Sequence, residues 1–287
     1  MAIGASRRTR KTINGVLIGL GIGVILVVIL FPFYWMLITS LKDYDQIRSI
    51  RTPFMPNPLS FAGYASLLVT GKHPFVMWYV NSASVALIVT PITVIVSALA
   101  AYALIRLRFL GAGLLASVIL IVYLVPGSLL FIPMYQVVKF FGLVGQIQAL
   151  WLVYPTFSIP FATWLMMGYV QSLPEDLEEA AMIDGASRLQ TLIQVVLPLM
   201  APALLAVFLF TFTGVWNEYL YAFVMINRES QMTVPVGMTF MIINDIFQWP
   251  DLMAGAVLIT VPVVILFIYT QRFMVEGLTA GGVKGEV

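Results

Sequence analysis

A short polar segment, residues 171–198, stands between two long apolar runs and carries the side chains whose chemistry is easiest to interpret. Its centre reads EAAMIDGASRLQTLIQVVLP. Carboxylates gather at the start of a predicted helix, where the helix dipole favours negative charge by about 0.3–1 kcal/mol each. These carboxylates belong to Glu175, Asp176, Glu178 and Glu179. Acidic side chains in this setting predict a surface on which another protein docks.

The same segment contains the signals of two short helices. Ser172 and Glu175 have the spacing of a capping box, and Pro174 between them is tolerated in a first turn. Gly185 permits a positive φ and is expected to end the first helix. Ser187 can cap the second helix, in which apolar residues recur at helical spacing. Those residues are Leu189, Leu192, Ile193 and Val196, and Pro198 marks the start of the next apolar run.

Two interpretations of this segment compete. A solvated loop whose acidic face only keeps the protein soluble would need no partner. The thin surface of Ala180 and Ala181, by contrast, lets a partner come close to the backbone, and the apolar stripe on the second helix needs something to cover it. We therefore favour docking.

A single carboxylate, Glu218, is the one acidic residue inside any predicted membrane span. An ionisable group there is costly and normally faces a bundle interior or a wet cavity. One hypothesis is that Trp216, Asn217, Glu218 and Tyr219 line a translocation path, since aromatic faces and polar groups together hold sugars. The alternative is that Glu218 bonds a neighbouring helix and keeps the spans in register.

Other chemistry is poorly supported by the sequence. No G-x-x-x-x-G-K-[ST] phosphate loop occurs, and no Ser/His/Asp or metal-ligand cluster is evident. The chain has no cysteine, which excludes disulfides and thiolate metal sites. The lone His73, beside Lys72, is expected to be a surface residue. We expect neither a catalytic residue nor a metal site in this chain.

The elements that must position these residues are membrane helices. The chain is 61% hydrophobic and only 10% charged, with a mean hydropathy of +0.98, whereas soluble domains carry about 25% charged residues. Six stretches without any charge can each hold the roughly 20 apolar residues that cross a bilayer. These stretches are 12–41, 73–105, 109–138, 140–174, 189–217 and 252–271. Because the runs are continuously apolar and do not alternate, they predict helices and exclude a barrel.

We therefore expect an all-α integral membrane protein with six transmembrane helices in a single transmembrane domain, residues 1–287. The predicted spans are 14–38, 77–104, 113–133, 149–170, 199–226 and 253–274, followed by a tail at 275–287. Prolines inside or at the edges of the spans predict kinks that neighbouring helices satisfy. The glycines at positions 15, 19 and 23 predict a helix face that another helix can approach closely.

Orientation follows from the basic residues near the span ends. Nine Lys and Arg gather on the face of the N-terminus, the 105–112 loop, the 171–198 loop and the tail, against six on the other face. Both termini are thus predicted to be cytoplasmic, with the first span acting as a signal anchor. On the outer face, residues 42–75 predict a proline-rich segment with a short helix near Phe61–Leu68, and residues 227–252 form a second sizeable loop.

The spacing within the docking segment resembles the EAA loop of ABC importer permeases. It runs Glu179-Ala180-Ala181, three residues, Gly185, nine residues, then Val195-x-Leu197-Pro198. Three further stretches are similar to the carbohydrate-uptake branch, specifically the second permease of the maltose type. They are LFPFYWMLITSLKD, the run from Gly214 to Tyr219, and QRFMVEGLTAGGVKG.

The resemblance implies a set of roles and partners. The ATPase-coupling residues would be Glu179, Ala180, Ala181, Asp184, Gly185, Leu197 and Pro198, and the tail residues Gly281, Gly282 and Lys284 would make a second ATPase contact. The partners implied are a second homologous permease, two copies of an ABC ATPase, an extracytoplasmic solute-binding protein and the lipid bilayer of a bacterial or archaeal inner membrane, with no nucleic acid. ATP and Mg²⁺ would be bound by the ATPase, so this chain would carry no cofactor.

Three alternatives stay open. Within the ABC class the cargo could be a polyol or a glycerol phosphodiester, although an anionic cargo should leave cationic residues in the pathway, and no Lys or Arg lies within the spans before Arg272. An ion-coupled transporter could use Glu218 as its proton site. An intramembrane enzyme would need more catalytic groups than Glu218 alone. Neither of the last two requires the docking segment.

Overall fold

The computed structural model describes residues 2–49, 52–243 and 246–282, and for residues 2–12, 243, 246 and 274–282 it describes the backbone alone. Helices make up almost all of the regular structure. In chain order the elements are α1 (Ala2–Ser40), α2 (Tyr44–Arg48), α3 (Ala62–Leu68), α4 (Phe75–Arg106), α5 (Ala112–Leu124), η1 (Gly127–Leu129), α6 (Phe131–Phe140), α7 (Gln148–Ser172), α8 (Asp176–Ile183), α9 (Arg188–Thr191), the π-helical η2 (Leu192–Val196), α10 (Leu197–Leu199), α11 (Ala201–Trp216), α12 (Leu220–Met225), η3 (Glu229–Gln231), α13 (Val234–Thr239), β1 (Ile242–Ile243), β2 (Ile246–Phe247) and α14 (Trp249–Gly282).

The chain divides into two compact units. One joins Met1–His73 to Met241–Leu258, and the other joins Pro74–Phe240 to Ile259–Val287. Helix α14 passes from the first unit into the second, so the expectation of a single transmembrane domain stays a prediction.

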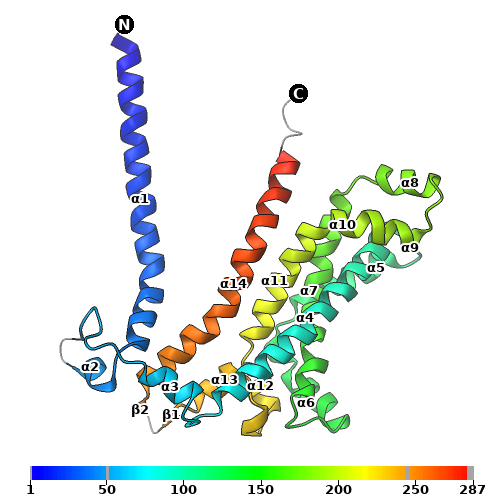
Figure 1. Ribbon diagram of the computed structural model, residues 1–287. Coiled ribbons are helices and arrows are strands. Elements are labelled where there is room, and N and C mark those ends of the chain that lie inside the picture. Colours follow the sequence, from blue (N-terminus) through cyan, green and yellow to red (C-terminus); the bar gives the residue numbers. More distant parts are fainter. Residues whose placement is uncertain (1, 50–51, 244–245, 283–287) are drawn as a thin grey trace. The chain divides into compact units, whose positions relative to one another are not determined.

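The second unit is a bundle built around α4, α7 and α11 (Figure 1). Small side chains let α4 and α7 approach closely: Ala98 and Ala101 are buried in one cluster with Ala162 and Met166. A hydroxyl pair joins the same two helices, with the oxygens of Thr93 and Ser158 2.8 Å apart. The contact between α4 and α7 thus combines apolar packing with one pair of hydroxyls that bond each other. Within the unit, α8 and α9 lie at one end and α6 and α12 at the other (Figure 1).

The predicted spans are only partly matched. Within the described residues, four helices are long and apolar enough to cross a membrane, and a bent pair can form a fifth span. The four lie in α1, α4, α7 and α14, close to the predicted 14–38, 77–104, 149–170 and 253–274. The all-helical membrane architecture is confirmed at this coarser level.

The predicted third span, 113–133, is not one helix. Helix α5 ends at Leu124 after 13 residues, which gives it a length of about 20 Å at 1.5 Å per residue. Val125 is extended because Pro126 disfavours helical backbone in the residue before it. A 3₁₀ turn and α6 then follow. Tyr123 of α5 stacks on Trp164 of α7, so α5 still packs in the bundle.

The predicted fifth span, 199–226, is also broken. The helices Arg188–Leu199 and Ala201–Trp216 meet at an angle of 73° at Met200. Pro202 begins α11 and has no N–H to continue the preceding helix. A second break separates α11 from α12 at residues 217–219.

The segment between α12 and α14 contacts the start of α4 and also contains two short strands. Residues 227–240 wrap the start of α4: Trp78 donates its indole N–H to the Glu229 carbonyl at 3.0 Å, and Gly237 leaves room for the Trp78 ring. The short strands β1 and β2 pair antiparallel, which is an exception to the all-α expectation.

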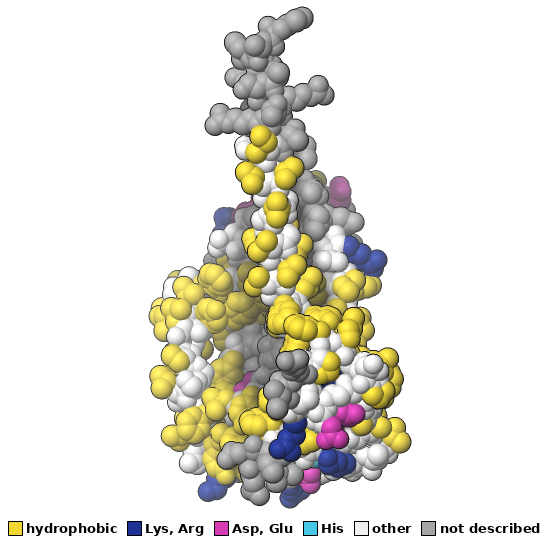
Figure 2. Space-filling view, turned by 90° about the vertical axis from the view of Figure 1, so that its left-hand side faces the viewer, with side chains coloured by type: hydrophobic (Ala, Val, Ile, Leu, Met, Phe, Trp, Pro, Cys, Tyr) yellow, Lys and Arg dark blue, Asp and Glu magenta, His cyan; other side chains and the backbone are white. Residues whose placement is uncertain are grey.

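Within the first unit, helix α1 exposes apolar side chains along its length from Ile13 to Leu37, with none of its most apolar stretch buried (Figure 2). Nothing in the described chain lies within 4 Å of a side chain added at Gly15, Gly19 or Gly23. The close helix contact expected at these glycines therefore stays a prediction. The surface of α1 suits lipid or another protein chain.

The proline-rich segment, residues 42–75, contacts the start of α14, also within the first unit. The predicted short helix is confirmed as α3, and its Ser66 hydroxyl donates to Asp251 at 2.9 Å. Lys72 binds the same carboxylate at 3.2 Å. The expectation that His73 is simply exposed is wrong, because its side chain is only 12% exposed and stands 3.9 Å from Asp251. Lys42 is buried under the Trp35 ring, and burial lowers the pKa of its ammonium.

Candidate functional site

The first helix of the docking segment, α8, ends just before Gly185, as predicted. Helix α8 is followed by Gly185 at φ +92°, a conformation that an L side chain rarely adopts. The N–H of Gly185 donates to the Met182 carbonyl at 3.1 Å and that of Ala186 to the Ala181 carbonyl at 3.0 Å. These two bonds form a Schellman motif, which satisfies the last carbonyls of α8 and turns the chain sharply.

The two predicted caps have different outcomes. Ser187 caps α9 in a complete capping box with Gln190, at 3.3 Å and 2.8 Å, as predicted. The capping box predicted for Ser172 and Glu175 is wrong. Helix α7 continues to Ser172, whose hydroxyl donates to the Tyr169 carbonyl at 2.7 Å. The Glu175 carboxylate is held by arginines instead of reaching back to the chain.

The apolar stripe of the second helix is split between two faces. Leu192 and Val196 are buried in the bundle core, so they need no outside partner, contrary to expectation. Leu189 and Ile193 are exposed, as is Ile183 at 85%. The predicted coupling residues lie around this apolar surface: Glu179, Ala180, Asp184, Gly185 and Pro198 are exposed, while Ala181 and Leu197 are half-buried.

Arg106 is a part of this site that sequence reasoning missed. From the sequence, its charge contributes only to the predicted orientation in the membrane. In the structure Arg106 is the last residue of α4, and its side chain reaches the docking segment. Its Nε donates to Glu178 at 2.6 Å, its Nη2 to the Leu173 carbonyl at 2.7 Å and its Nη1 to Glu175 at 3.3 Å. Arg108 adds two bonds to Glu175, at 2.8 Å and 2.9 Å. About seventy residues separate these partners, so local spacing carries no signal of the contact.

The predicted contact of the tail with the ATPase stays a prediction. Helix α14 continues to Gly282, so Gly281 and Gly282 belong to a helix and not to a separate glycine-rich tail beginning at residue 275. Lys284 lies outside the described residues.

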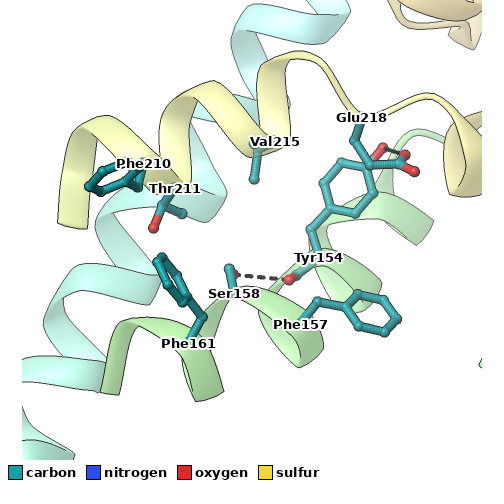
Figure 3. Close-up of a pocket in the computed structure, with 9 residues that line it drawn as sticks. Tyr154, Phe157, Ser158, Phe161, Phe210, Thr211, Val215 and Glu218 are labelled. Carbon is teal, nitrogen blue, oxygen red and sulfur yellow. Dashed lines mark hydrogen bonds between the residues drawn. The ribbon is translucent and has the colours of Figure 1, made fainter. Parts of the chain in front are cut away.

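A second candidate site is a cavity of about 280 Å³ between α7 and α11 (Figure 3). Aromatic rings dominate its wall, and hydroxyls and one carboxylate supply the polar groups. The lining residues are Tyr154, Phe157, Ser158, Phe161, Phe210, Thr211, Gly214, Val215 and Glu218. Rings with a few polar atoms can hold a molecule that has both apolar faces and hydroxyl groups.

Glu218 sits at the break between α11 and α12 and is the one predicted pathway residue that lines the cavity. Its carboxylate accepts the Tyr154 hydroxyl at 2.6 Å and the backbone N–H groups of Tyr221 at 2.9 Å and Ala222 at 3.1 Å. These bonds join α7 to the start of α12. The structure therefore shows both the helix-joining contact and a place on the cavity wall.

The other three predicted pathway residues lie elsewhere. Trp216 is buried against Phe212, and its indole N–H donates to the Ile259 carbonyl at 3.1 Å. Asn217 donates to the Thr213 carbonyl at 2.9 Å, and Tyr219 stacks on Phe223. The α7 side of the cavity was not predicted. Its signal in the sequence is the run of aromatic and hydroxyl residues around Pro155 and Pro160.

A bundle of long apolar helices, with a capped two-helix loop at one end and a mainly aromatic cavity that carries a few polar groups, is typical of a multi-pass membrane transport subunit. The match to known proteins is specific: the chain belongs to the family described as the inner membrane component of binding-protein-dependent transport systems, whose model matches residues 93–276. It is accordingly a non-enzymatic permease component of an ABC transporter.

Relatives of full length support this assignment. The chain is 33% identical to the inner membrane ABC transporter permease protein YcjP of Escherichia coli (strain K12), over 96% of this chain and 99% of the relative. It is 34% identical to the trehalose/maltose transport system permease protein MalG of Thermococcus litoralis, over the same shares. A crystal structure of a bacterial ABC transporter for alginate import matches its fold with a TM-score of 0.78 at 23% identity, covering 91% of this chain and 96% of that chain.

Proposed function

We propose that this permease belongs to an ATP-driven importer of a sugar or oligosaccharide and that residues 171–198 dock on a separate ATPase subunit. The observation that carries the proposal is the α8–α9 loop. Its capped turn is rigid, and its surface presents apolar side chains beside the carboxylates of Glu179 and Asp184. Exposed apolar side chains rimmed by charges are typical of a protein interface.

The partners follow from the family. A second, homologous permease, two copies of the ATPase and an extracytoplasmic solute-binding protein would complete the transporter. A related structure carries an alginate pentasaccharide-bound periplasmic protein in complex with the transporter. ATP and Mg²⁺ would be bound by the ATPase, since this chain has no phosphate loop.

We also propose six membrane crossings with both termini in the cytoplasm. Arg106 at the end of α4 contacts Glu178 at the start of α8, so both lie at one end of the bundle. Helix α7 has 25 residues and ends at the same place, so its start is about 35 Å away at 1.5 Å per residue. Residues 107–147 must cover that distance in the opposite direction. This supports a crossing by α5 and α6 together, and the bent pair would provide another.

Sugar cargo is favoured by the wall of the cavity. Hydroxyls of Ser158 and Thr211 and the Glu218 carboxylate can bond sugar hydroxyls while the rings cover sugar faces. The residues that line the cavity include no Lys or Arg, which suits a neutral cargo better than an anionic one. Several relatives are named for trehalose, maltose or galactooligosaccharide transport, and one for sulfoquinovosyl glycerol.

The proposed mechanism is alternating access. Closure of the two ATPases on ATP would move the part of the loop from Glu179 to Gly185. The membrane helices would then open the cavity outward to receive cargo from the binding protein. An ion-coupled mechanism would give the docking surface no task.

The proposal is tested by detergent pull-down of the ATPase with wild type and Gly185→Arg at equal membrane expression. Gly142→Arg is the matched control, because Gly142 also has a positive φ, has open space around it and follows α6, at the other end of the unit. We expect wild type and the control to retain an ATP-binding partner and Gly185→Arg to lose it. Equal behaviour of all three would contradict docking at this loop.

Cargo is tested separately by uptake with Glu218→Gln in the assembled transporter. If Glu218 contacts cargo, the order of preference among sugars changes and uptake falls. An unchanged preference, with reduced assembly as the cause of all lost uptake, would leave Glu218 with the helix-joining role only.

A further inference from the structure

The ion pairs at the base of the docking loop are unequal in burial. The side chains of Arg106 and Glu178 are only 7% and 8% exposed, whereas those of Arg108 and Glu175 are 73% and 46% exposed. Exposed pairs contribute little because water screens them. A buried pair behaves differently, since removal of either partner leaves an uncompensated charge.

Arg106 makes contacts that a simple positive charge cannot make. Each of its three guanidinium nitrogens has its own acceptor: Glu178, the Leu173 carbonyl and Glu175. A planar fork holds such a set rigidly, and a lysine ammonium does not. Tyr102, one turn earlier on α4, also interacts with the Glu178 carboxylate. The start of α8 is therefore tied to the last turn of α4 at several points.

Glu178 and Glu179 lie on different faces of α8. Glu179 is exposed on the surface proposed to meet the ATPase, whereas Glu178 is buried against α4. Helix α4 packs along α7 and α11, the two helices that line the cavity. A displacement of α8 thus has a direct route into the bundle through this buried pair.

We propose that Arg106 is a positioning residue that makes α8 move together with α4, so that motion of the docking loop is transmitted to the helices around the cavity. The inference rests on the proposed docking function and deepens it. It assigns the transmission step to one buried ion pair, separate from the exposed residues that would touch the ATPase. Loss of the pair should then uncouple ATP hydrolysis from transport while the ATPase stays bound.

The test uses the complete transporter with its ATPase and binding protein, in lipid vesicles. Arg106→Lys keeps the charge and removes the fork. Arg108→Gln is the matched control, because Arg108 lies two residues further along the chain and has an exposed side chain. Three quantities are measured: ATPase retained in pull-down, ATP hydrolysis, and sugar transported per ATP hydrolysed. For Arg106→Lys we expect ATPase retention near wild type and a loss of at least about fivefold in transport per ATP, the low end of measured coupling between sites. Arg108→Gln should stay within about twofold, as expected for an exposed pair.

A second variant covers the case in which Arg106→Lys assembles poorly. Glu178→Gln keeps the shape of the side chain and removes its charge, and the double variant with Arg106→Lys should uncouple no more than the stronger single variant if the two residues act as one pair. The inference is overturned if transport per ATP is unchanged in both single variants, or if transport falls only in proportion to ATPase retention. If wild type itself retains no ATPase, the proposed function fails, and this inference fails with it.

Discussion

Two carboxylates in this protein are held in contrasting ways, although both join separate helices. Glu178, at the docking end, is buried and paired with the guanidinium of Arg106. Glu218, on the cavity wall, accepts one tyrosine hydroxyl and two backbone N–H groups. Among the described residues, no Lys or Arg lies within 4.0 Å of Glu218.

The difference fits the two roles that we propose, a joint between helices for Glu178 and a cargo contact for Glu218. In the pair of Glu178 and Arg106 the charges cancel inside the bundle, and nothing is left over for a ligand. Glu218 accepts three hydrogen bonds from protein groups and also lines the cavity. A carboxylate so placed can accept further hydrogen bonds from a hydroxyl-rich cargo.

Glu178→Ala should have the largest effect on stability. It leaves Arg106 buried with its best acceptor removed, and breaking a buried pair costs about 3–5 kcal/mol. Thermal unfolding of the purified protein in detergent measures the loss. Glu179→Ala, the exposed neighbour, is the control and should stay within about 0.5 kcal/mol of wild type. Equal effects of the two substitutions would contradict the contrast between the buried Glu178 and the exposed Glu179.

Tyr154→Phe should have the next largest effect. It removes only the hydroxyl that donates to Glu218 at 2.6 Å, and hydrogen bonds to charged groups contribute about 1.5–3 kcal/mol. Unfolding in detergent should show a loss in this range, together with reduced uptake. Tyr169→Phe is the control, because its hydroxyl makes an exposed bond of 3.3 Å to the Leu199 carbonyl. If Tyr154→Phe were neutral, Glu218 would not depend on α7 for its position.

The same contrast explains what could be predicted from the sequence. Local signals succeeded: the spacing around Gly185 and Ser187 predicted a turn and a cap that both form, because each depends on contacts between near neighbours. Long apolar runs likewise predicted the spans in α1, α4, α7 and α14, since composition alone decides whether a helix suits a membrane.

Contacts between distant residues were out of reach. Arg106 meets Glu178 across 72 positions and Tyr154 meets Glu218 across 64, and no periodicity in one segment reveals which other segment it packs against. The burial of Trp216 away from the cavity could not be predicted for the same reason, and its place in a pathway stays a prediction. An aromatic residue beside Glu218 looked like a sugar contact, but packing buried it. The end of α5 at Leu124 was not predicted, because Pro126 within the predicted span 113–133 indicated a kink and not the end of a helix.

Ser187→Ala should cost about 1 kcal/mol, the usual value for loss of an N-cap. Its hydroxyl accepts from the Gln190 N–H, and the Gln190 side chain completes the box. Ser172→Ala is the matched control, since the Ser172 hydroxyl caps no helix and donates only to the carbonyl three residues earlier. Unfolding midpoints of the two variants in the same detergent decide the matter. A larger loss for Ser172→Ala would contradict the structure and would support the capping box predicted for Ser172 and Glu175.

Ile183→Ser should leave the isolated chain almost unchanged, within about 0.5 kcal/mol, because an 85% exposed side chain has little packing to lose. Its effect should appear only in the complex. A buried isoleucine contributes about 1.5–3 kcal/mol, so covering it in an interface predicts roughly tenfold or greater weakening of ATPase capture on substitution. Phe140→Ser is the matched control, because Phe140 is equally exposed but is the last residue of α6, at the other end of the unit. Weaker capture with Ile183→Ser alone would support binding of the ATPase through the exposed apolar side chains of this loop. The buried Glu178 would then position the loop without touching the ATPase. Equal capture would place the ATPase contact elsewhere on the chain.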